Sequence, residues 1–163
     1  MEKIKWGIIG PGNIANNFAD GLKGSYSGQL VSIASKSEDR RKNFGDKYDI
    51  HPDFRFDSYE DIINSEHIDA IYISTPHTLH AQWTIKAAGK GKHILCEKPG
   101  AINFNEGKKI IDAVREAGVF YMEGFMYRCH PQIPKLVDII KNKIIGDVIS
   151  IEASFGFDMG KTI

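Results

Sequence analysis

A glycine-rich motif near the start of the chain lies between a short apolar run and a helical pattern. It reads Gly10-Pro11-Gly12-Asn13-Ile14-Ala15 and fits the form G-x-G-x-x-A. Gly10 permits a tight turn, Gly12 lets a pyrophosphate approach the backbone, and Ala15 is small enough for close helix packing. The free N–H groups where the helix begins, at Asn13 and Ile14, favour an anion. The motif predicts dinucleotide binding, and a glycine turn without a ligand is the alternative.

The end of the next predicted strand carries a lysine and hydroxyl groups where a carboxylate is common. Sites that prefer NAD usually place Asp or Glu about 20 residues after the glycine motif, where it holds the ribose 2′-hydroxyl. Here that place reads Ser35-Lys36-Ser37, and Arg40 follows. These groups can bind a 2′-phosphate, so NADP is favoured as the cofactor and NAD stays possible. The alternative is that Lys36 and Arg40 only solvate the start of a helix.

A loop with small hydroxyl residues, a proline and two histidines follows a later strand. It reads Ser74-Thr75-Pro76-His77, with His80 three residues further on. The carboxyl edge of a parallel sheet is where ligands of open α/β folds bind, and small residues suit a loop that passes close to a cofactor. His77 and His80 have no nearby carboxylate or cysteine partners in the sequence, so we expect no metal site.

A lysine also stands at a strand end in Glu97-Lys98-Pro99. Lys98 could donate a proton or a hydrogen bond to a substrate oxygen, and Glu97 could tune it by its charge. A surface ion pair at a turn is the alternative. The segment from Glu123 to Pro131 mixes aromatic rings with Arg128 and His130, which suits a pocket for nicotinamide and a hydroxylated substrate. It suits an ordinary domain hinge equally well.

Strands and helices must alternate along the chain to position these groups. Apolar runs predict strands over residues 4–9, 29–35, 70–74, 93–96 and 119–123, and helical spacing predicts helices over 14–22, 38–48, 80–88, 103–117 and 133–140. A short helix is expected after Ser58, which begins a capping box with Asp61. This alternation predicts an α/β fold with a doubly wound parallel sheet, the Rossmann dinucleotide-binding class.

The last part of the chain differs from the alternating part. The apolar stripe of the helix over 133–140 is expected to pack on the sheet, and residues 147–157 read as a fresh strand without a partner. We therefore expect a dinucleotide-binding domain over 1–124, and a crossover helix with the first strand of a truncated second α/β domain over 125–163. The segment from Asp147 could also pair with another copy, so a homo-oligomer is possible.

Composition narrows the classes of protein and partner. The chain has 163 residues, 42% of them hydrophobic, with 21 Lys plus Arg against 21 Asp plus Glu. The chain is long enough to form a hydrophobic core of its own. It has no net charge that would attract nucleic acid or an anionic membrane surface, so neither partner is expected. The chain begins by leading into a strand rather than a signal peptide, which favours the cytoplasm. The two cysteines, Cys96 and Cys129, are expected to be buried or half-buried thiols.

The motifs at residues 10–15, 74–80 and 97–99, in this order and spacing, resemble the Gfo/Idh/MocA oxidoreductase family over nearly the whole chain. Residues 123–131 look most similar to its branch of dimeric dihydrodiol dehydrogenases and NADP-dependent D-xylose dehydrogenases. The resemblance implies hydride transfer between NAD(P) and a sugar or a cyclic alcohol. It makes Lys98 the catalytic lysine. The other implied site residues line the cofactor (Thr75, Pro76, His77 and His80) or lie near the nicotinamide and substrate (Arg128 and His130).

The chain departs from this family in length. Members are about twice as long, and their second catalytic group, usually a histidine or tyrosine, comes from the C-terminal domain. The resemblance therefore implies an incomplete catalytic set in these 163 residues. A stand-alone nucleotide-binding or regulatory module without catalysis is the competing interpretation.

Overall fold

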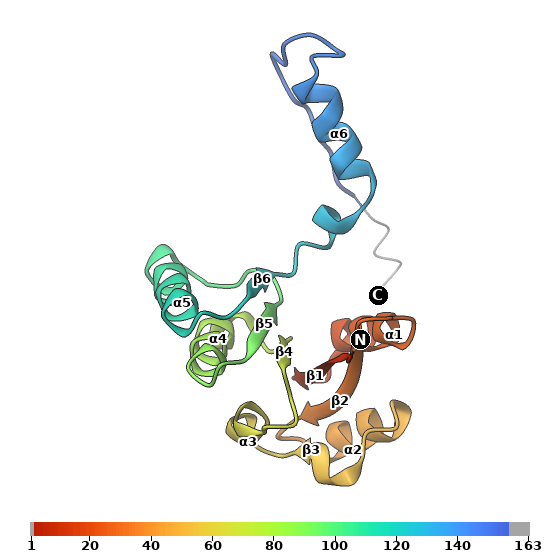
Figure 1. Cartoon of the computed structure of the whole chain (residues 1–163), viewed down its shortest axis with the longest axis vertical. Helices are drawn as coiled ribbons and strands as arrows, with labels where there is room; N and C mark the ends of the chain where they lie inside the picture. Colours follow the sequence, from red (N-terminus) through yellow and green to blue (C-terminus); the bar gives the residue numbers. More distant parts are fainter. Residues whose placement is uncertain (1, 157–163) are drawn as a thin grey trace, which may run out of the picture. The chain divides into compact units, whose positions relative to one another are not determined.

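The computed structural model describes residues 2–156, and the chain divides into two compact units, Met1–Gly124 and Phe125–Ile163. In the described part, the first unit contains one six-stranded parallel sheet with the order β3-β2-β1-β4-β5-β6 (Figure 1). The strands are β1 (Ile4–Ile9), β2 (Gly28–Ala34), β3 (Arg55–Phe56), β4 (Ala70–Ile73), β5 (His93–Cys96) and β6 (Tyr121–Glu123). The predicted doubly wound parallel sheet is confirmed, and the strand order reverses between β1 and β4.

Helices cover both faces of this sheet. They are α1 (Asn13–Lys23), α2 (Glu38–Lys47), α3 (Tyr59–Asn64), α4 (His80–Ala88) and α5 (Phe104–Ala117), and α6 (Gln132–Lys141) belongs to the second unit. Figure 1 shows α1 and α2 on one side of the sheet and α3, α4 and α5 on the other. This arrangement follows from right-handed crossovers, because the direction of winding changes at β1.

Two apolar cores lie on the two faces of the sheet. Successive residues of a strand point to opposite faces. Ile8 therefore belongs to the cluster under α1 and α2, whereas Ile9 belongs to the cluster under α3 and α4. Both side chains are fully buried. One strand thus anchors both helical layers.

Local capping explains where several helices begin and end. The Ser58 hydroxyl accepts hydrogen bonds from the backbone N–H groups of Glu60 and Asp61, so the predicted cap of α3 is confirmed. Asn103 caps α5 by accepting the N–H of Glu106. That helix ends at Gly118, whose φ of +64° favours glycine.

The structure differs from the sequence-based expectations in several places. A three-residue helical turn at Pro52–Phe54 and the two-residue strand β3 were not predicted. The strand expected over residues 147–157 is wrong, since 148–156 have no regular structure, and Phe157 lies outside the described residues. A strand requires a neighbour for its backbone hydrogen bonds, and this segment has none among residues 2–156. No residue of α6 is fully buried, and the packing of its apolar stripe on the sheet stays a prediction, because α6 belongs to the second unit.

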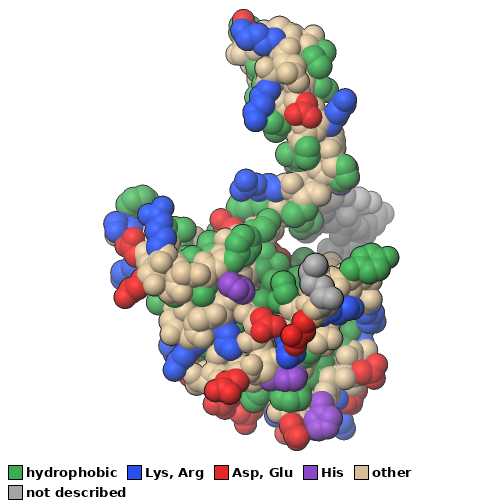
Figure 2. All heavy atoms as spheres, in the orientation of Figure 1, with side chains coloured by type: hydrophobic (Ala, Val, Ile, Leu, Met, Phe, Trp, Pro, Cys, Tyr) green, Lys and Arg blue, Asp and Glu red, His purple; other side chains and the backbone are tan. Residues whose placement is uncertain are grey.

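The exposed surface is mixed in charge. Figure 2 shows Lys and Arg side chains interspersed with Asp and Glu over the visible face of the first unit. Within residues 2–156, no helix has the length and apolar character needed to cross a membrane.

Candidate cofactor site

The glycine motif forms the turn between β1 and α1. Gly10 has a φ of +91°, and a Cβ there would lie 3.0 Å from the carbonyl oxygen of Ser74, so this position requires glycine. Gly12 differs, because an added Cβ would meet no atom of the described chain within 4 Å. Packing inside the protein therefore gives no reason for Gly12 to be glycine. A ligand that approaches the backbone would give one.

The N-terminus of α1 is open to an anion. Among residues 2–156, no side chain caps this helix at Gly12, and its first turn has no acidic residue. Its first N–H groups include those of Asn13, which is exposed, and of Ile14, which is half-buried. Uncapped N–H groups and the helix dipole together attract a phosphate.

The loop after β4 is joined to the glycine turn. The Ser74 hydroxyl donates to the Gly10 carbonyl oxygen at 2.8 Å, and the Ser74 N–H donates to the Ile9 carbonyl oxygen at 3.0 Å. The Thr75 hydroxyl is buried and has no hydrogen-bond partner within the described residues. Pro76 and His77 follow it and are exposed. A buried hydroxyl without a partner at this edge fits a site that a polar ligand completes.

His80 lies at the start of α4 but is fully buried. Its Nδ1 is 2.7 Å from the Pro99 carbonyl oxygen, and its Nε2 is 2.8 Å from the Thr75 carbonyl oxygen. Both ring nitrogens are therefore occupied by the backbone of two loops. The contact of His80 with a cofactor stays a prediction.

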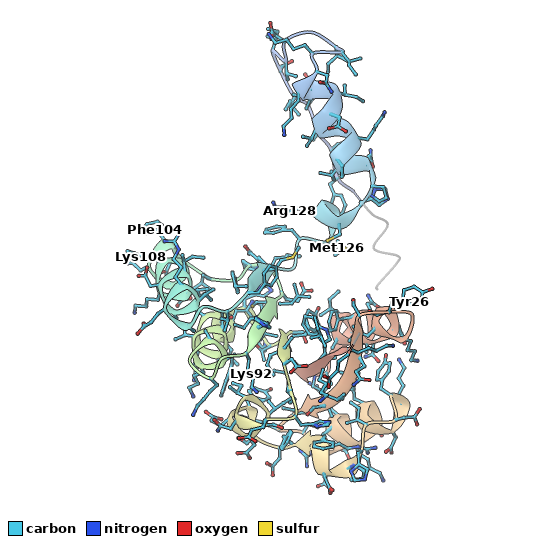
Figure 3. The ribbon with its side chains drawn as sticks, viewed as in Figure 1. Tyr26, Lys92, Phe104, Lys108, Met126 and Arg128 are labelled. Atoms are coloured by element: carbon cyan, nitrogen blue, oxygen red, sulfur yellow. The ribbon has the colours of Figure 1, made fainter. Side chains whose placement is uncertain are left out.

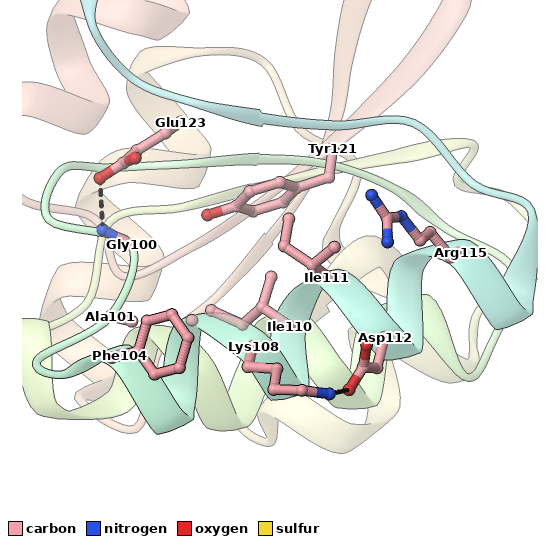
Figure 4. A pocket seen from close by; sticks show the side chains of 11 residues that line it. Gly100, Ala101, Phe104, Lys108, Ile110, Ile111, Asp112, Arg115, Tyr121 and Glu123 are labelled. Carbon is pink, nitrogen blue, oxygen red and sulfur yellow. Dashed lines mark hydrogen bonds and ion pairs between the residues drawn. The ribbon is translucent and has the colours of Figure 1, made fainter.

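The loop that carries Lys98 is held at several points. The Tyr72 hydroxyl donates to Glu97 Oε1 at 2.6 Å, and the Gly100 N–H donates to Glu123 Oε1 at 2.7 Å (Figure 4). Burial and the bond to Glu97 raise the pKa of Tyr72 well above its ordinary value, so the phenol keeps its proton. Lys98 itself is exposed. A fixed backbone thus presents a lysine side chain that can turn toward a substrate.

A cavity of about 540 Å³ adjoins this loop on the side of α5 (Figure 4). Its lining is mostly apolar, from Phe104, Ile110 and Ile111, and Lys108 in it pairs with Asp112 at 2.7 Å. Glu123 also lines the cavity, but its Oε1 is already bonded to Gly100. The cavity therefore adjoins the Lys98 loop at Gly100, and Arg115 and Tyr121 are further polar residues in its mostly apolar lining.

The end of β2 gathers positive charge. Ser35 is buried and its hydroxyl accepts the Ser37 N–H, whereas Lys36 and Arg40 are exposed. The Nζ of Lys36 lies 6.0 Å from the centre of the Tyr59 ring. Burial raises the pKa of the Tyr59 phenol, and the positive charge of Arg40 partly opposes that rise. Lys36 at the end of β2 therefore lies near the Tyr59 ring at the start of α3, and the charge of Arg40 also acts on the Tyr59 phenol.

Arg128 and His130 belong to the second unit. Arg128 lies in the short helical turn Met126–Cys129 (Figure 3), and both side chains are exposed. The Nδ1 of His130 accepts the Gln132 N–H at 3.2 Å. Their contact with a nicotinamide or a substrate stays a prediction. Over residues 2–156, no three His, Cys, Asp or Glu side chains are grouped so that they could hold a metal ion.

Sequence reasoning missed Arg41 and Tyr72 near the candidate site and named Glu123 only as the start of the segment 123–131. Arg41 donates to the Ser35 carbonyl oxygen at 2.7 Å, and Tyr72 and Glu123 hold the Lys98 loop. Glu123 had a usable signal, since it is a carboxylate at the end of a predicted strand. Tyr72 had none, because an aromatic residue in an apolar strand is typical of core packing.

The parallel sheet, the open helix N-terminus and the glycine turn define a Rossmann-type nucleotide-binding domain. A sequence profile described as "Oxidoreductase family, NAD-binding Rossmann fold" (GFO_IDH_MocA) matches residues 4–125. The chain belongs to this family, and the resemblance inferred from the three motifs is confirmed.

Curated relatives and solved structures agree with this assignment. The chain is 35% identical over 159 residues to trans-1,2-dihydrobenzene-1,2-diol dehydrogenase of Xenopus tropicalis, covering 96% of this chain and 48% of the relative. It is 33% identical to D-xylose 1-dehydrogenase (NADP(+)) 2 of Haloferax volcanii, covering 94% and 46%. A crystal structure of the 3-ketoreductase KijD10 from Actinomadura kijaniata with NADP superimposes with a TM-score of 0.79 at 31% identity, covering 89% and 46%. The chain spans about half the length of these relatives.

Proposed function

We propose that the first unit binds NADP(H), and NAD(H) less tightly, across the carboxyl edge of β1 and β4. The single observation that carries this proposal is Gly12, where a Cβ would meet no atom of the described chain within 4 Å, directly at the uncapped start of α1. The buried Thr75 hydroxyl without a partner lies on the adjoining loop. Phosphate groups would accept from the first N–H groups of α1, and the ligand would supply the Thr75 hydroxyl with a partner.

The preference for NADP is supported at the end of β2. Lys36 and Arg40 are exposed there near Tyr59, so a 2′-phosphate would interact with two cations. The segment Ser35–Ser37 contains no carboxylate that would repel this phosphate. The Haloferax volcanii relative has NADP(+) in its name, and the Actinomadura kijaniata structure holds NADP, and both support the same choice. The 2′-hydroxyl of NAD would gain much less from these charges.

For the whole protein, we propose a dehydrogenase that acts on a sugar or a cyclic alcohol. The nicotinamide, when bound, gives or takes a hydride. Lys98 would hold the substrate oxygen by a hydrogen bond from Nζ and move a proton there, since its side chain is exposed on a loop fixed by Glu97 and Gly100. Arg128 and His130 would orient the substrate. The diol and D-xylose named for the relatives support this substrate class.

Calorimetry with a matched pair of glycine variants tests cofactor binding. Gly12→Ala should weaken NADPH binding by about 10- to 100-fold, because the methyl group displaces a phosphate from charge-assisted N–H contacts. Its cost in folding free energy should stay within about 1 kcal/mol, the difference between glycine and alanine at a helix start. Gly21→Ala is the control, since its Cβ also meets no described atom within 4 Å but lies along α1. Wild-type chain without NADPH binding, or equal binding by Gly12→Ala, would contradict the proposal.

A further inference from the structure

His80 has an unusual hydrogen-bonding environment. It is 0% exposed, and its two ring nitrogens lie 2.7 and 2.8 Å from the carbonyl oxygens of Pro99 and Thr75. Carbonyl oxygens only accept hydrogen bonds, whereas a neutral imidazole has one N–H donor and one acceptor nitrogen. A neutral ring would place a nitrogen lone pair against an oxygen lone pair at one of these short distances. Only the imidazolium form donates to both.

Other histidines of the chain show the opposite arrangement. The Nδ1 of His93 accepts the Phe120 N–H at 3.0 Å, and the Nδ1 of His51 accepts the Asp53 N–H at 3.4 Å. The bond to His93 needs an Nδ1 without a proton, whereas the Nδ1 of His51 also lies 3.5 Å from Asp53 Oδ2. His93 is therefore an internal reference for a ring with an acceptor nitrogen, to which the His80 ring can be compared.

A buried positive charge needs compensation by nearby polar groups. The two carbonyl dipoles supply part of it. Glu97 and Glu123 add negative charge on the segments beside Pro99, since Glu97 begins that loop and Glu123 binds its Gly100 N–H. His77 is the titratable neighbour along the chain, with its ring centre 5.5 Å from that of His80. Two carboxylates thus contact the segments that adjoin Pro99, whose carbonyl oxygen faces His80.

We propose that His80 is a doubly protonated positioning residue that couples the Thr75 loop to the Lys98 loop. The bond to Thr75 fixes the loop that follows β4, and the bond to Pro99 fixes the residue next to Lys98. One cation thereby sets the spacing between a loop assigned to the cofactor and the lysine assigned to the substrate. The coupling itself is a property of the folded chain, and its effect on the cofactor rests on the proposed function.

Nuclear magnetic resonance of the 163-residue chain tests the ring directly. Histidine labelled with ¹⁵N is observed without cofactor at pH 7.5, where a free histidine side chain is mostly neutral. The His80 ring should show two protonated nitrogens, and the His93 ring should show one nitrogen without a proton. Scalar couplings across the hydrogen bonds, from Nδ1 to the Pro99 carbonyl carbon and from Nε2 to the Thr75 carbonyl carbon, should both be present. An unprotonated nitrogen on His80, or a missing coupling, would overturn the proposal without any variant.

Two variants test the coupling between the loops. His80→Gln should speed amide hydrogen exchange at Gly100 by about tenfold or more, because the glutamine side chain cannot donate to both carbonyls. His93→Gln, the matched control, should leave Gly100 unchanged. Equal exchange at Gly100 in all three chains would overturn the coupling.

The cofactor arm separates this proposal from the proposed function. NADPH affinity should fall in His80→Gln and persist in His93→Gln. A wild-type chain that does not bind NADPH would contradict the proposed function and leave the ring measurements valid. If the wild-type chain binds NADPH and His80→Gln binds it with the same affinity, only the effect of His80 on the cofactor is overturned.

Discussion

The Tyr72 hydroxyl donates to Glu97 Oε1 at 2.6 Å, joining the middle of β4 to the residue that follows β5. Tyr72 is 2% exposed and its ring stacks on Phe18 of α1, with ring centres 4.1 Å apart. Glu97 also receives the Lys98 N–H at 3.3 Å through its other oxygen. A packing residue under α1 therefore controls the orientation of the carboxylate beside the proposed catalytic lysine.

Removing this hydroxyl should weaken the fold. In Tyr72→Phe, the half-buried Glu97 carboxylate loses its short bond, and we expect a loss of about 1–3 kcal/mol in the free energy of unfolding. Urea unfolding measures the loss. Tyr26→Phe is the control, because Tyr26 is 97% exposed and its change should be within about 0.5 kcal/mol. Equal stability of the two variants would show that the Tyr72–Glu97 bond contributes nothing.

Cofactor preference should depend on Lys36. NADPH should bind more tightly than NADH, and Lys36→Ala should lower that ratio by about tenfold, since it removes one charge-assisted contact to the 2′-phosphate. Lys42→Ala is the matched control, because Lys42 is exposed elsewhere on α2. Titration calorimetry with both cofactors gives the ratio. Equal or reversed affinities in wild type, or an unchanged ratio in Lys36→Ala, would reject the assignment.

The two thiols should differ in reactivity. Cys96 is buried, as expected, but Cys129 is exposed, so the expectation of a buried or half-buried thiol is wrong for Cys129. Burial, with smaller contributions from Glu123 and Glu97, raises the pKa of the Cys96 thiol to about 12. A disulfide reagent should therefore modify one thiol in the folded chain and both in denaturant. Cys129→Ser should leave the folded chain unreactive, and rapid modification of that variant would contradict the burial of Cys96.

The same thiol predicts a loss of stability at high pH. The folded state holds the Cys96 proton more tightly than the unfolded state, whose thiol pKa is about 8.5. The stabilisation is therefore complete below about pH 8.5 and is lost as pH rises toward 12, by up to about 1.4 kcal/mol per pH unit. Unfolding measured at pH 8 and pH 10.5 should show a smaller fall in Cys96→Ala than in wild type. An equal fall would mean that other groups cause it.

The 163-residue chain should bind cofactor without turning over sugars or cyclic diols at an enzyme-like rate. Its relatives are about twice as long, and losing a positioned proton-transfer group costs about 10² to 10⁴ in rate before the loss of substrate orientation is added. NADP reduction followed by absorbance with a panel of aldoses and diols measures this. Robust turnover that disappears in Lys98→Ala would show a complete active site within this chain.

Much of the first unit could be predicted from the sequence because its signals are local. The helix over His80–Ala88 and the strand over His93–Cys96 have the predicted bounds, since apolar spacing and the flanking glycines define them. The two-residue strand β3 gave no such signal. It forms because Ile33 and Ala34 of β2 offer backbone partners to Arg55 and Phe56, a tertiary effect that periodicity does not record.

The strand ends that carry the candidate site were predictable, and the hydrogen-bond partners of its side chains were less so. Motifs at strand ends locate the carboxyl edge, because parallel strands bring their ends together. The partners of a side chain depend on loops far apart in the sequence. His80 illustrates this, since nothing in residues 74–80 indicates that its ring nitrogens bond to Thr75 and to Pro99, which is 19 residues away.

The opposite orientations of Ile8 and Ile9 also make unfolding cooperative. Both helical layers pack on the same strands, so unfolding of one layer would also remove β1 from the core of the other layer. The two tryptophans report on this, because Trp6 packs against the cluster under α1 and Trp83 lies in the cluster under α4. Two variants, each with one of the two tryptophans replaced, should therefore lose their native fluorescence at the same urea concentration. Separate midpoints would mean that the two faces of one sheet melt independently.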